Sequence, residues 1–253
     1  GMEEHKIKFS VITATYNAAT VLPHLIASLQ AQTDQDFEWV VADGASKDET
    51  LTLLEEAGKV LNVRVDSRPD FGIYDALNRA IGLAKGSYYL VVGADDDLYP
   101  DAIAKYKQAC RLSGADLVTA MIEVDGRVVA PRERRREWLY GMAAHVSGHS
   151  VGLAVQRCLH DRLGLYSRKL PITADQLFVL RAVHAGANVH KCDFVAGRFG
   201  PEGMSGGDSF GTLIEYFRTQ VLVGHSLWLQ LTLLVFRLVR HPVAYRPIRS
   251  PKS

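Results

Sequence analysis

The residues best suited to chemistry are three adjacent aspartates, Asp95-Asp96-Asp97, directly after an apolar run over residues 88–92. Neighbouring carboxylates repel one another, and a divalent cation relieves that repulsion because hard cations prefer oxygen ligands. The alternative is an Asp-rich turn that caps a helix, since aspartate is common in both settings. Taken alone, the triplet leaves a metal site and a turn equally open.

Polar residues also follow two earlier apolar runs. Thr15-Tyr16-Asn17 comes after the first run, and Asp43-Gly44 after the second. Tyr16 either stacks on a nucleobase or covers the core. Asp43 is suited to accept a hydrogen bond from a base or a ribose, and Gly44 permits a sharp turn beside it.

A third polar group lies in residues 70–78, where Asp70 and Gly72 belong to a loop that leads into a helix. Asp75 and Asn78 are poor residues for a helix interior because their side chains compete for backbone hydrogen bonds. Their presence indicates a ligand on that side of the helix.

The elements that must position these residues alternate along the first hundred residues. We expect strands at residues 8–14, 37–42, 63–65 and 88–92. Helices are expected after an N-cap at Thr20, after a capping box of Ser46 and Glu49, and over residues 73–84 with a stop at Gly86. This alternation predicts an α/β fold with a parallel sheet covered on both faces. Ligands of such sheets gather at the carboxyl ends of the strands.

The second half is less regular. We expect a helix over residues 100–112, a hairpin of residues 117–124 and 127–130 that turns at Asp125-Gly126, and a helix over residues 175–185 stopped by Gly186. Residues 200–207 must form a loop, followed by one long C-terminal helix. The resulting division is residues 1–7 (a tag remnant, Gly1 before Met2, and a tail), 8–116, 117–207 and 208–253.

Composition narrows the class of protein. The formal net charge of the 253 residues is +1, which argues against general binding of nucleic acid. The three cysteines lie far apart, so we expect neither a disulfide framework nor a cysteine zinc site. The sequence begins without the pattern of a signal peptide. These features favour a cytoplasmic protein.

The C-terminal segment, residues 226–240, is apolar but is interrupted by Gln230, Thr232 and Arg237. It falls short of the length that spans a bilayer. Two interpretations stay open: the segment packs on the body of the protein, or it contacts a membrane surface or a partner. The charged run of residues 132–137 is a solvated face, or it offers cations to an anionic acceptor or membrane.

Together these motifs resemble the inverting glycosyltransferases of family 2, which have the GT-A fold. The resemblance covers about residues 8–98 and rests on Thr15-Tyr16-Asn17, on residues 43–48, on residues 72–78 and on Asp95-Asp96. Each motif alone is weak, and four in the right order are strong. The stretch around Gly72 looks most like the branch that builds bacterial exopolysaccharides such as colanic acid. Ala14 departs from the proline that many members carry.

The resemblance implies a GT-A nucleotide-diphospho-sugar transferase fold, with a Rossmann-like, mostly parallel sheet and a C-terminal helical extension. It implies that Thr15, Tyr16, Asp43, Asp70, Gly72, Asn78 and Asp95 bind the nucleotide sugar, with Tyr16 stacked on the base. Asp96 would ligate Mn²⁺ or Mg²⁺ in the manner of a DXD motif. UDP is favoured as the nucleotide by the habit of the family.

The catalytic base is expected in the second half. Thr173-Ala174-Asp175-Gln176 resembles the base motif of the family, so Asp175 would take a proton from the acceptor hydroxyl; the alternative is that Asp175 only caps its helix. His149 resembles a histidine that this branch carries before the base motif; it would contact the diphosphate or the acceptor, and a structural histidine is an equal alternative. Residues 203–206 resemble a glycine-rich loop that folds over the donor.

The sequence thus predicts an inverting, metal-dependent hexosyltransferase of polysaccharide synthesis that acts on a glycan or lipid-linked acceptor, in the cytoplasm or at the inner face of the plasma membrane. A nucleotidyltransferase that activates sugars is a rival, but the loop at residues 13–17 lacks the glycine-rich, basic character of that class. An inactive nucleotide-sugar-binding relative is another. A dinucleotide-binding domain is excluded because no Gly-x-Gly-x-x-Gly follows the first strand.

Overall fold

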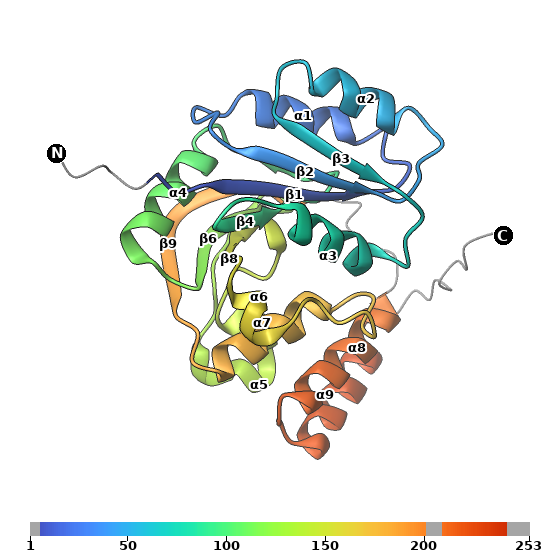
Figure 1. The fold of residues 1–253 in the computed structure, drawn as a ribbon. Coiled ribbons are helices and arrows are strands. Elements are labelled where there is room, and N and C mark those ends of the chain that lie inside the picture. The colour runs from blue at the N-terminus through green and yellow to red at the C-terminus, as the bar shows by residue number, and fades with distance from the viewer. Residues whose placement is uncertain (1–5, 201–208, 242–253) are drawn as a thin grey trace.

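The computed structural model describes residues 6–200 and 209–241, and its centre is a curled sheet of nine strands within those residues (Figure 1). The strands are β1 (Phe9–Thr15), β2 (Glu38–Asp43), β3 (Val63–Ser67), β4 (Tyr88–Val91), β5 (Asp97–Leu98), β6 (Leu117–Val124), β7 (Arg127–Val129), β8 (Leu153–Gln156) and β9 (Val189–Arg198). The helices are α1 (Leu22–Gln30), α2 (Thr50–Ala57), α3 (Ile73–Leu83), α4 (Ala102–Ser113), α5 (Glu137–Tyr140), α6 (Leu159–Leu163), α7 (Ala174–His184), α8 (Ser209–Leu222) and α9 (Leu227–Arg240).

The first four strands form a parallel unit in the order β3-β2-β1-β4. Their register aligns Thr15 with Asp43 and Asp43 with Ser67, so the carboxyl ends of three strands meet at one edge. Beyond β4 the sheet becomes mixed, because β8 runs antiparallel to both β4 and β6. The predicted α/β, GT-A-like fold is confirmed, with a sheet that is mixed rather than mostly parallel.

Two apolar layers hold the sheet between helices. One contains Leu25 of α1, Leu54 of α2 and Tyr106 of α4. The other contains Leu77 of α3 and Phe178 of α7. Because both faces of the sheet are buried, the central strands are continuous apolar runs, as the sequence indicated.

Several predicted element ends are confirmed. Asp125 (φ 51°) and Gly126 (φ 75°) form the tight turn between β6 and β7. Gly186, with φ 89°, follows the end of α7. Residues 201–208, which include the whole of the predicted glycine-rich loop (residues 203–206), lie outside the described residues.

Other helix ends were predicted wrongly. α1 follows Val21 and has no side-chain cap from Thr20. α2 begins without the predicted capping box, because the Ser46 hydroxyl donates to Asp43 instead. The side chain of Asp48 accepts the Thr50 amide at 3.0 Å and so supports the start of α2.

Gly86 does not end α3. That helix stops at Leu83, and Ala84 is extended. A Cβ atom at position 86 would lie 2.5 Å from Ser10 Oγ. The glycine is therefore required by the close approach of the chain to β1, not by a left-handed helix cap.

The predicted single C-terminal helix is two helices, α8 and α9, which pack side by side as a hairpin (Figure 1). The chain turns at Gly224 (φ 101°), and the Ser226 hydroxyl then caps α9 by accepting the Leu229 amide. The hairpin binds backbone carbonyls of α5: the Gln220 and Gln230 amides donate to Trp138 at 3.1 and 2.8 Å.

The outer side of α9 carries exposed apolar residues. Trp228, Val235, Phe236 and Val239 recur at helical spacing and are all more than half exposed. The inner side is anchored by buried Gln230 and Leu234. The segment therefore packs on the body through one face only. No helix in the described residues is long and apolar enough to cross a membrane.

Candidate functional site

Asp43, at the carboxyl end of β2, is the hub of the first group of predicted residues. Its carboxylate is fully buried and accepts four hydrogen bonds. The donors are the hydroxyls of Thr15 (2.7 Å), Ser46 (2.6 Å) and Ser67 (2.8 Å) and the Ser46 amide (2.8 Å). Burial alone raises the pKa of Asp43, but these hydrogen bonds outweigh it and hold the pKa below its ordinary value.

Thr15 and Asp43 thus bind each other at the strand ends. The Thr15 side chain is buried, and its hydroxyl is donated to Asp43. Contact of Asp43 with a nucleobase requires that one of its four donors be exchanged for the base. The role of these two residues in nucleotide binding stays a prediction, and their observed role is to hold the ends of β1, β2 and β3 together.

Tyr16, Gly44 and Asp70 form an open wall beside this hub. The Tyr16 side chain is 70% exposed, as a stacking platform requires. A Cβ atom on Gly44 would lie 2.9 Å from Asp70 Oδ2 and 3.3 Å from Tyr16 Cδ2, so a larger residue here would displace the Asp70 carboxylate. Burial raises the pKa of Asp70, and the Gly72 amide and the Arg79 charge oppose that rise.

Backbone strain is concentrated at the same wall. Asn17 (φ 46°) and Ala45 (φ 60°) both have left-handed backbone conformations, which are costly for residues with a side chain and cluster at functional sites. Gly72 (φ 110°) precedes α3 and is the residue type that this conformation requires.

Arg79 belongs to this wall although the sequence analysis did not single it out. Its guanidinium lies 3.3 Å from Asp66 and 3.6 Å from Asp70. All three of its nitrogens are buried without a hydrogen-bond partner among the described residues, which leaves the group able to bind an acceptor on a ligand. The sequence did contain a signal for Arg79: it is a basic residue seven positions after Gly72, on the face of Gly72 and Asp75.

Asn78 of α3 binds a segment that is distant in the sequence. Its side-chain nitrogen donates to the Tyr166 carbonyl at 2.9 Å, and its oxygen accepts the Tyr166 amide at 3.0 Å. Both polar ends of the side chain are thereby used to hold a distant segment against α3. The structure shows Asn78 in a positioning role, and its predicted place in the nucleotide pocket stays a prediction.

The aspartate triplet lies after β4, at the same sheet edge. Asp96 is only 3% exposed. Its two oxygens accept the amides of Gly93 (2.8 Å) and Gly200 (2.7 Å). Burial, with a smaller contribution from the charges of Asp95 and Asp97, raises the pKa of Asp96 to about 6.

This donor set fits a divalent cation. Asp95 and Asp97 are half-buried and flank the buried Asp96. The raised pKa of Asp96 reports the repulsion and burial that a cation would offset. Carboxylates are the ligands that Mg²⁺ and Mn²⁺ prefer. Asp95, Asp96 and Asp97 are therefore the residues that could hold the ion.

Asp175 lies in the first turn of α7, at the other side of α3. Its Oδ1 accepts the Tyr74 hydroxyl at 2.8 Å. Burial raises the pKa of Asp175; the Tyr74 hydrogen bond opposes that rise, and the charge of Glu215 adds to it. A carboxylate with a raised pKa is suited to accept a proton near neutral pH.

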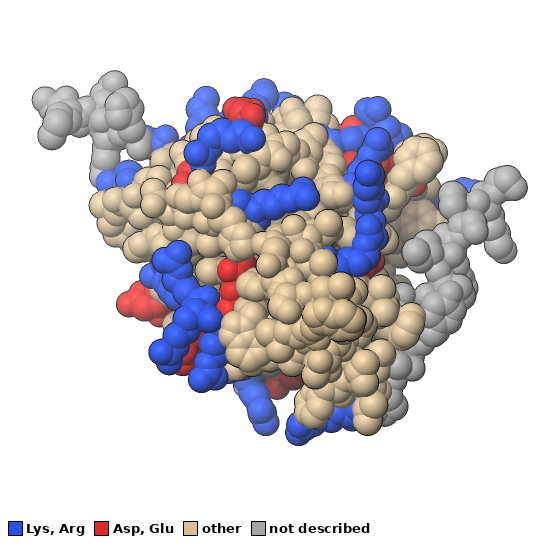
Figure 2. All heavy atoms as spheres, turned by 90° about the horizontal axis from the view of Figure 1, so that it is seen from below, with Lys and Arg blue, Asp and Glu red and all other residues tan. Residues whose placement is uncertain are grey.

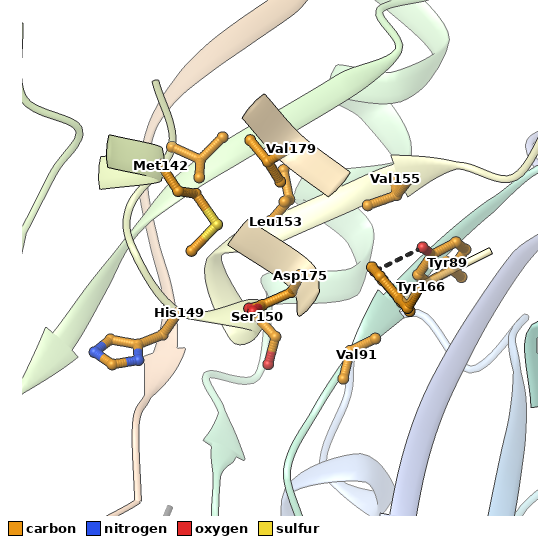
Figure 3. Close-up of a pocket in the computed structure, with 11 residues that line it drawn as sticks. Tyr89, Val91, Met142, His149, Ser150, Leu153, Val155, Tyr166, Asp175 and Val179 are labelled. Carbon is orange, nitrogen blue, oxygen red and sulfur yellow. Dashed lines mark hydrogen bonds between the residues drawn. The ribbon is translucent and has the colours of Figure 1, made fainter. Parts of the chain in front are cut away.

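Asp175 and His149 line the same small hollow (Figure 3). Its walls also include Tyr89, Tyr166 and Val179, and its volume of about 20 Å³ has room for little more than a water molecule. The imidazole of His149 points away from Asp175 in Figure 3 and stacks on Phe199 with ring centroids 3.7 Å apart. Burial lowers the pKa of His149, so its ring is neutral at physiological pH. Its role as a ligand stays a prediction.

α3 connects the two groups of residues. Its Arg79 faces Asp70 on the side of β1 and β2. Its Tyr74 and Asn78 reach Asp175 and Tyr166. The arrangement can therefore bind an anionic ligand at the sheet edge and hold a proton acceptor at a fixed place beside it.

Comparisons with known proteins agree with this geometry. The sequence model described as Glycosyl transferase family 2 matches residues 10–170. A PGL/p-HBAD biosynthesis glycosyltransferase of Mycobacterium bovis (strain BCG / Pasteur 1173P2) is 44% identical over 102 residues, which are 38% of this chain and 39% of that protein. Chondroitin synthase of Pasteurella multocida (strain Pm70) is 35% identical over 101 residues, which are 39% of this chain and 10% of that protein.

Solved structures share the fold. S. aureus TarS 1-349 in complex with UDP-GlcNAc has a TM-score of 0.70 at 22% identity, and the match covers 93% of this chain and 72% of that one. The mannosyltransferase PcManGT from Pyrobaculum calidifontis, in complex with GDP-Man and Mn²⁺, has a TM-score of 0.63 at 17% identity and covers 95% of this chain and 66% of that one.

Proposed function

The chain belongs to glycosyl transferase family 2, and from this premise we propose that it transfers a sugar from a nucleotide-diphosphate sugar to a hydroxyl group of an acceptor. This chain matches only 39% of the length of the mycobacterial relatives, so the activity of the whole protein is a proposal and is not taken over from them. The observation that carries the proposal is the pairing of Asp175 with Tyr74, which holds a carboxylate of raised pKa against α3, the helix whose Arg79 lies beside Asp70.

The proposed reaction is a single displacement with inversion. Asp175 takes the proton of the acceptor hydroxyl as that oxygen attacks the anomeric carbon, and the bond to the nucleotide diphosphate breaks on the opposite face. Tyr74 holds Asp175 in place through its hydroxyl. Tyr16 stacks on the nucleobase, and Arg79 binds an acceptor group of the nucleotide. A divalent ion held by the aspartate triplet would supply charge neutralisation for the departing diphosphate.

Donor binding is tested by calorimetry with UDP and GDP. We expect nucleotide affinity to increase with Mn²⁺ or Mg²⁺ and this increase to be lost in Asp96→Ala. Metal-independent binding of equal strength in both proteins would contradict the metal assignment. A thermal-shift screen of nucleotide sugars with and without Mn²⁺ then identifies the base and the sugar; UDP is the nucleotide that we propose, in keeping with the UDP-GlcNAc complex of TarS.

The role of Asp175 is tested by Asp175→Asn, which keeps the shape of the side chain. We expect unchanged nucleotide affinity and loss of transfer to a sugar acceptor. Asp161→Asn, at an exposed position on α6, is the matched control and should keep full transfer. Unchanged turnover in Asp175→Asn would remove Asp175 as the base.

The acceptor that we propose is a glycan or a lipid-linked sugar of cell-surface polysaccharide synthesis, at an anionic membrane surface. The exposed apolar side of α9 supports contact with lipid. Charge supports it too: residues 216–241 contain no Asp or Glu, and Arg237 and Arg240 occupy the last turn of α9. The face seen from below has a broad uncharged area bordered by Lys and Arg (Figure 2). The exopolysaccharide branch of the family is part of the same proposal.

Vesicle sedimentation tests the membrane contact. We expect the protein to sediment with phosphatidylglycerol vesicles more than with phosphatidylcholine vesicles, and Trp228→Ser with Phe236→Ser to abolish this. Leu112→Ser, at an exposed apolar position on α4, is the control and should have no effect. Self-association of the free protein that the same two substitutions abolish would identify the face as a contact between copies instead.

A further inference from the structure

A cluster of metal-ligating side chains lies where the C-terminal hairpin meets the rest of the protein, apart from the aspartate triplet. Its members are Glu137 at the start of α5, His184 at the end of α7 and His225 in the turn between α8 and α9. Each offers one ligand atom, and these atoms lie within 4.8 Å of one another. His184 Nε2 is 2.7 Å from Glu137 Oε1, and His225 Nε2 is 3.6 Å from the same oxygen.

A fourth side chain, His145, is aimed at the cluster. It is only 3% exposed, and its Nε2 lies 3.4 Å from Glu137 Oε2. Neither of its ring nitrogens has a hydrogen-bond partner among the described residues, and the same is true of His225 Nε2. Buried polar atoms are normally satisfied, so this concentration of unmet nitrogen atoms around one carboxylate points to a missing ligand.

The chemistry of the set selects the kind of ion. Imidazole nitrogen and carboxylate oxygen are ligands of Zn²⁺, whereas Mg²⁺ and Mn²⁺ prefer sets of oxygen alone. Three protein ligands leave a fourth tetrahedral position for water, which the 40% exposure of the His184 side chain allows. His145, on the far oxygen of Glu137, is placed to orient that ligand, as second partners of metal ligands commonly do.

We propose that Glu137, His184 and His225 bind a zinc ion that fastens the α8–α9 hairpin to the body of the protein. The three ligands come from separate elements, and His225 is the contribution of the hairpin. The inference stands independently of the proposed transferase activity. It assigns the ion a structural role, because the site is formed by side chains that the proposed reaction does not use.

The position of the hairpin matters for the start of α7. Glu215 of α8 accepts the backbone amides of Ile172 and Thr173 at 2.9 and 3.0 Å. Those residues lie three and two positions before Asp175. A zinc ion that fixes the hairpin at the His225 turn therefore also steadies the loop that carries Asp175.

Calorimetry with ZnCl₂ tests the site in the full-length chain without a polyhistidine tag, in saturating Mg²⁺ to occupy the carboxylates. We expect one zinc ion per chain and a higher melting temperature with zinc. His225→Asn should weaken zinc binding by more than about tenfold and remove the thermal shift. His24→Asn, at an exposed position on α1, is the matched control and should behave as the parent protein.

Asp96→Ala separates this site from the aspartate triplet. It should leave the zinc stoichiometry and affinity unchanged, and His184→Gln, at a half-exposed position, gives a second test if His225→Asn does not fold. Absence of a zinc isotherm in the parent protein, equal affinity in His225→Asn or His184→Gln, or loss of binding in Asp96→Ala would each overturn the proposal.

Discussion

Removal of one hydroxyl group from Tyr74 tests how the structure sets the pKa of Asp175. The Tyr74 hydroxyl lies 2.8 Å from Asp175 Oδ1 and 2.9 Å from the Ile172 carbonyl, so one proton is shared between two acceptors. In Tyr74→Phe the carboxylate loses its neutral donor while burial stays the same. Because that hydrogen bond favours the charged form, we expect the already raised pKa of Asp175 to rise further.

The size of the shift follows from the energy of the bond. A hydrogen bond to a charged group contributes about 1.5–3 kcal/mol, and one pKa unit corresponds to about 1.4 kcal/mol. Since the proton is shared with Ile172, the lower end applies, and the expected rise is about one pKa unit. As the proposed base must be ionised, the acid limb of the activity profile should move to higher pH by the same amount.

The assay is the pH dependence of kcat/KM for sugar transfer, which reports ionisations of the free enzyme. Tyr106→Phe is the matched control, because Tyr106 is also buried and its hydroxyl donates to the Val151 carbonyl at 2.9 Å, far from Asp175 in the other core layer. The control should lose about 1 kcal/mol of stability without a change of the profile. An acid limb in folded Tyr74→Phe that coincides with that of the parent protein would refute the reasoning.

Three further changes test the sheet edge. Asp43→Asn should lower the free energy of unfolding by about 2–3 kcal/mol at pH 7. Because the folded pKa of Asp43 is lowered, this stability is present above the pKa of the unfolded state and is lost as pH falls through the folded pKa. Urea melts should therefore show a smaller difference between the parent protein and the variant at pH 3 than at pH 7. Tyr16→Ala should weaken UDP binding in calorimetry by about 1–3 kcal/mol, whereas Tyr16→Phe should keep it; equal loss in both would exclude stacking. Gly200→Ala should abolish the response to Mn²⁺, because its Cβ atom would lie 2.2 Å from the Asp95 carbonyl oxygen. Gly82→Ala, at an exposed helix position with nothing within 4 Å of its Cβ atom, should leave that response intact and raise the melting temperature slightly.

The sequence was sufficient for the features that depend on local pattern. Short apolar runs that alternate with helical segments located β1, β2, β3 and β4. The polar residues after these runs marked the candidate functional edge, because parallel strands bring their carboxyl ends together. Tyr16, Gly44 and Asp70 meet there, as expected. The turn at Gly126 was equally local.

The features that were missed depend on contacts distant in sequence. The hydrogen bonds of Asn78 to Tyr166 could not be predicted, because the partner lies 88 positions away in the sequence. Gly86 looks like a helix cap, yet its reason is the approach of Ser10. The break between α8 and α9 was marked by Gly224 and Ser226, but the apolar run on both sides concealed it. Ser46 satisfied a capping pattern while its hydroxyl was committed to Asp43.

α3 sets a limit on how relatives of this protein can be recombined. Its side chains contact Asp70 through Arg79, and they contact the second half of the chain, at Tyr166 and Asp175, through Asn78 and Tyr74. A chimera joined at the midpoint of the chain would pair one parent's α3 with the other parent's Tyr166 segment and lose those contacts. Exchange of the second half, as a route to new acceptor specificity, therefore has to carry α3 along or transplant its two inward-facing residues.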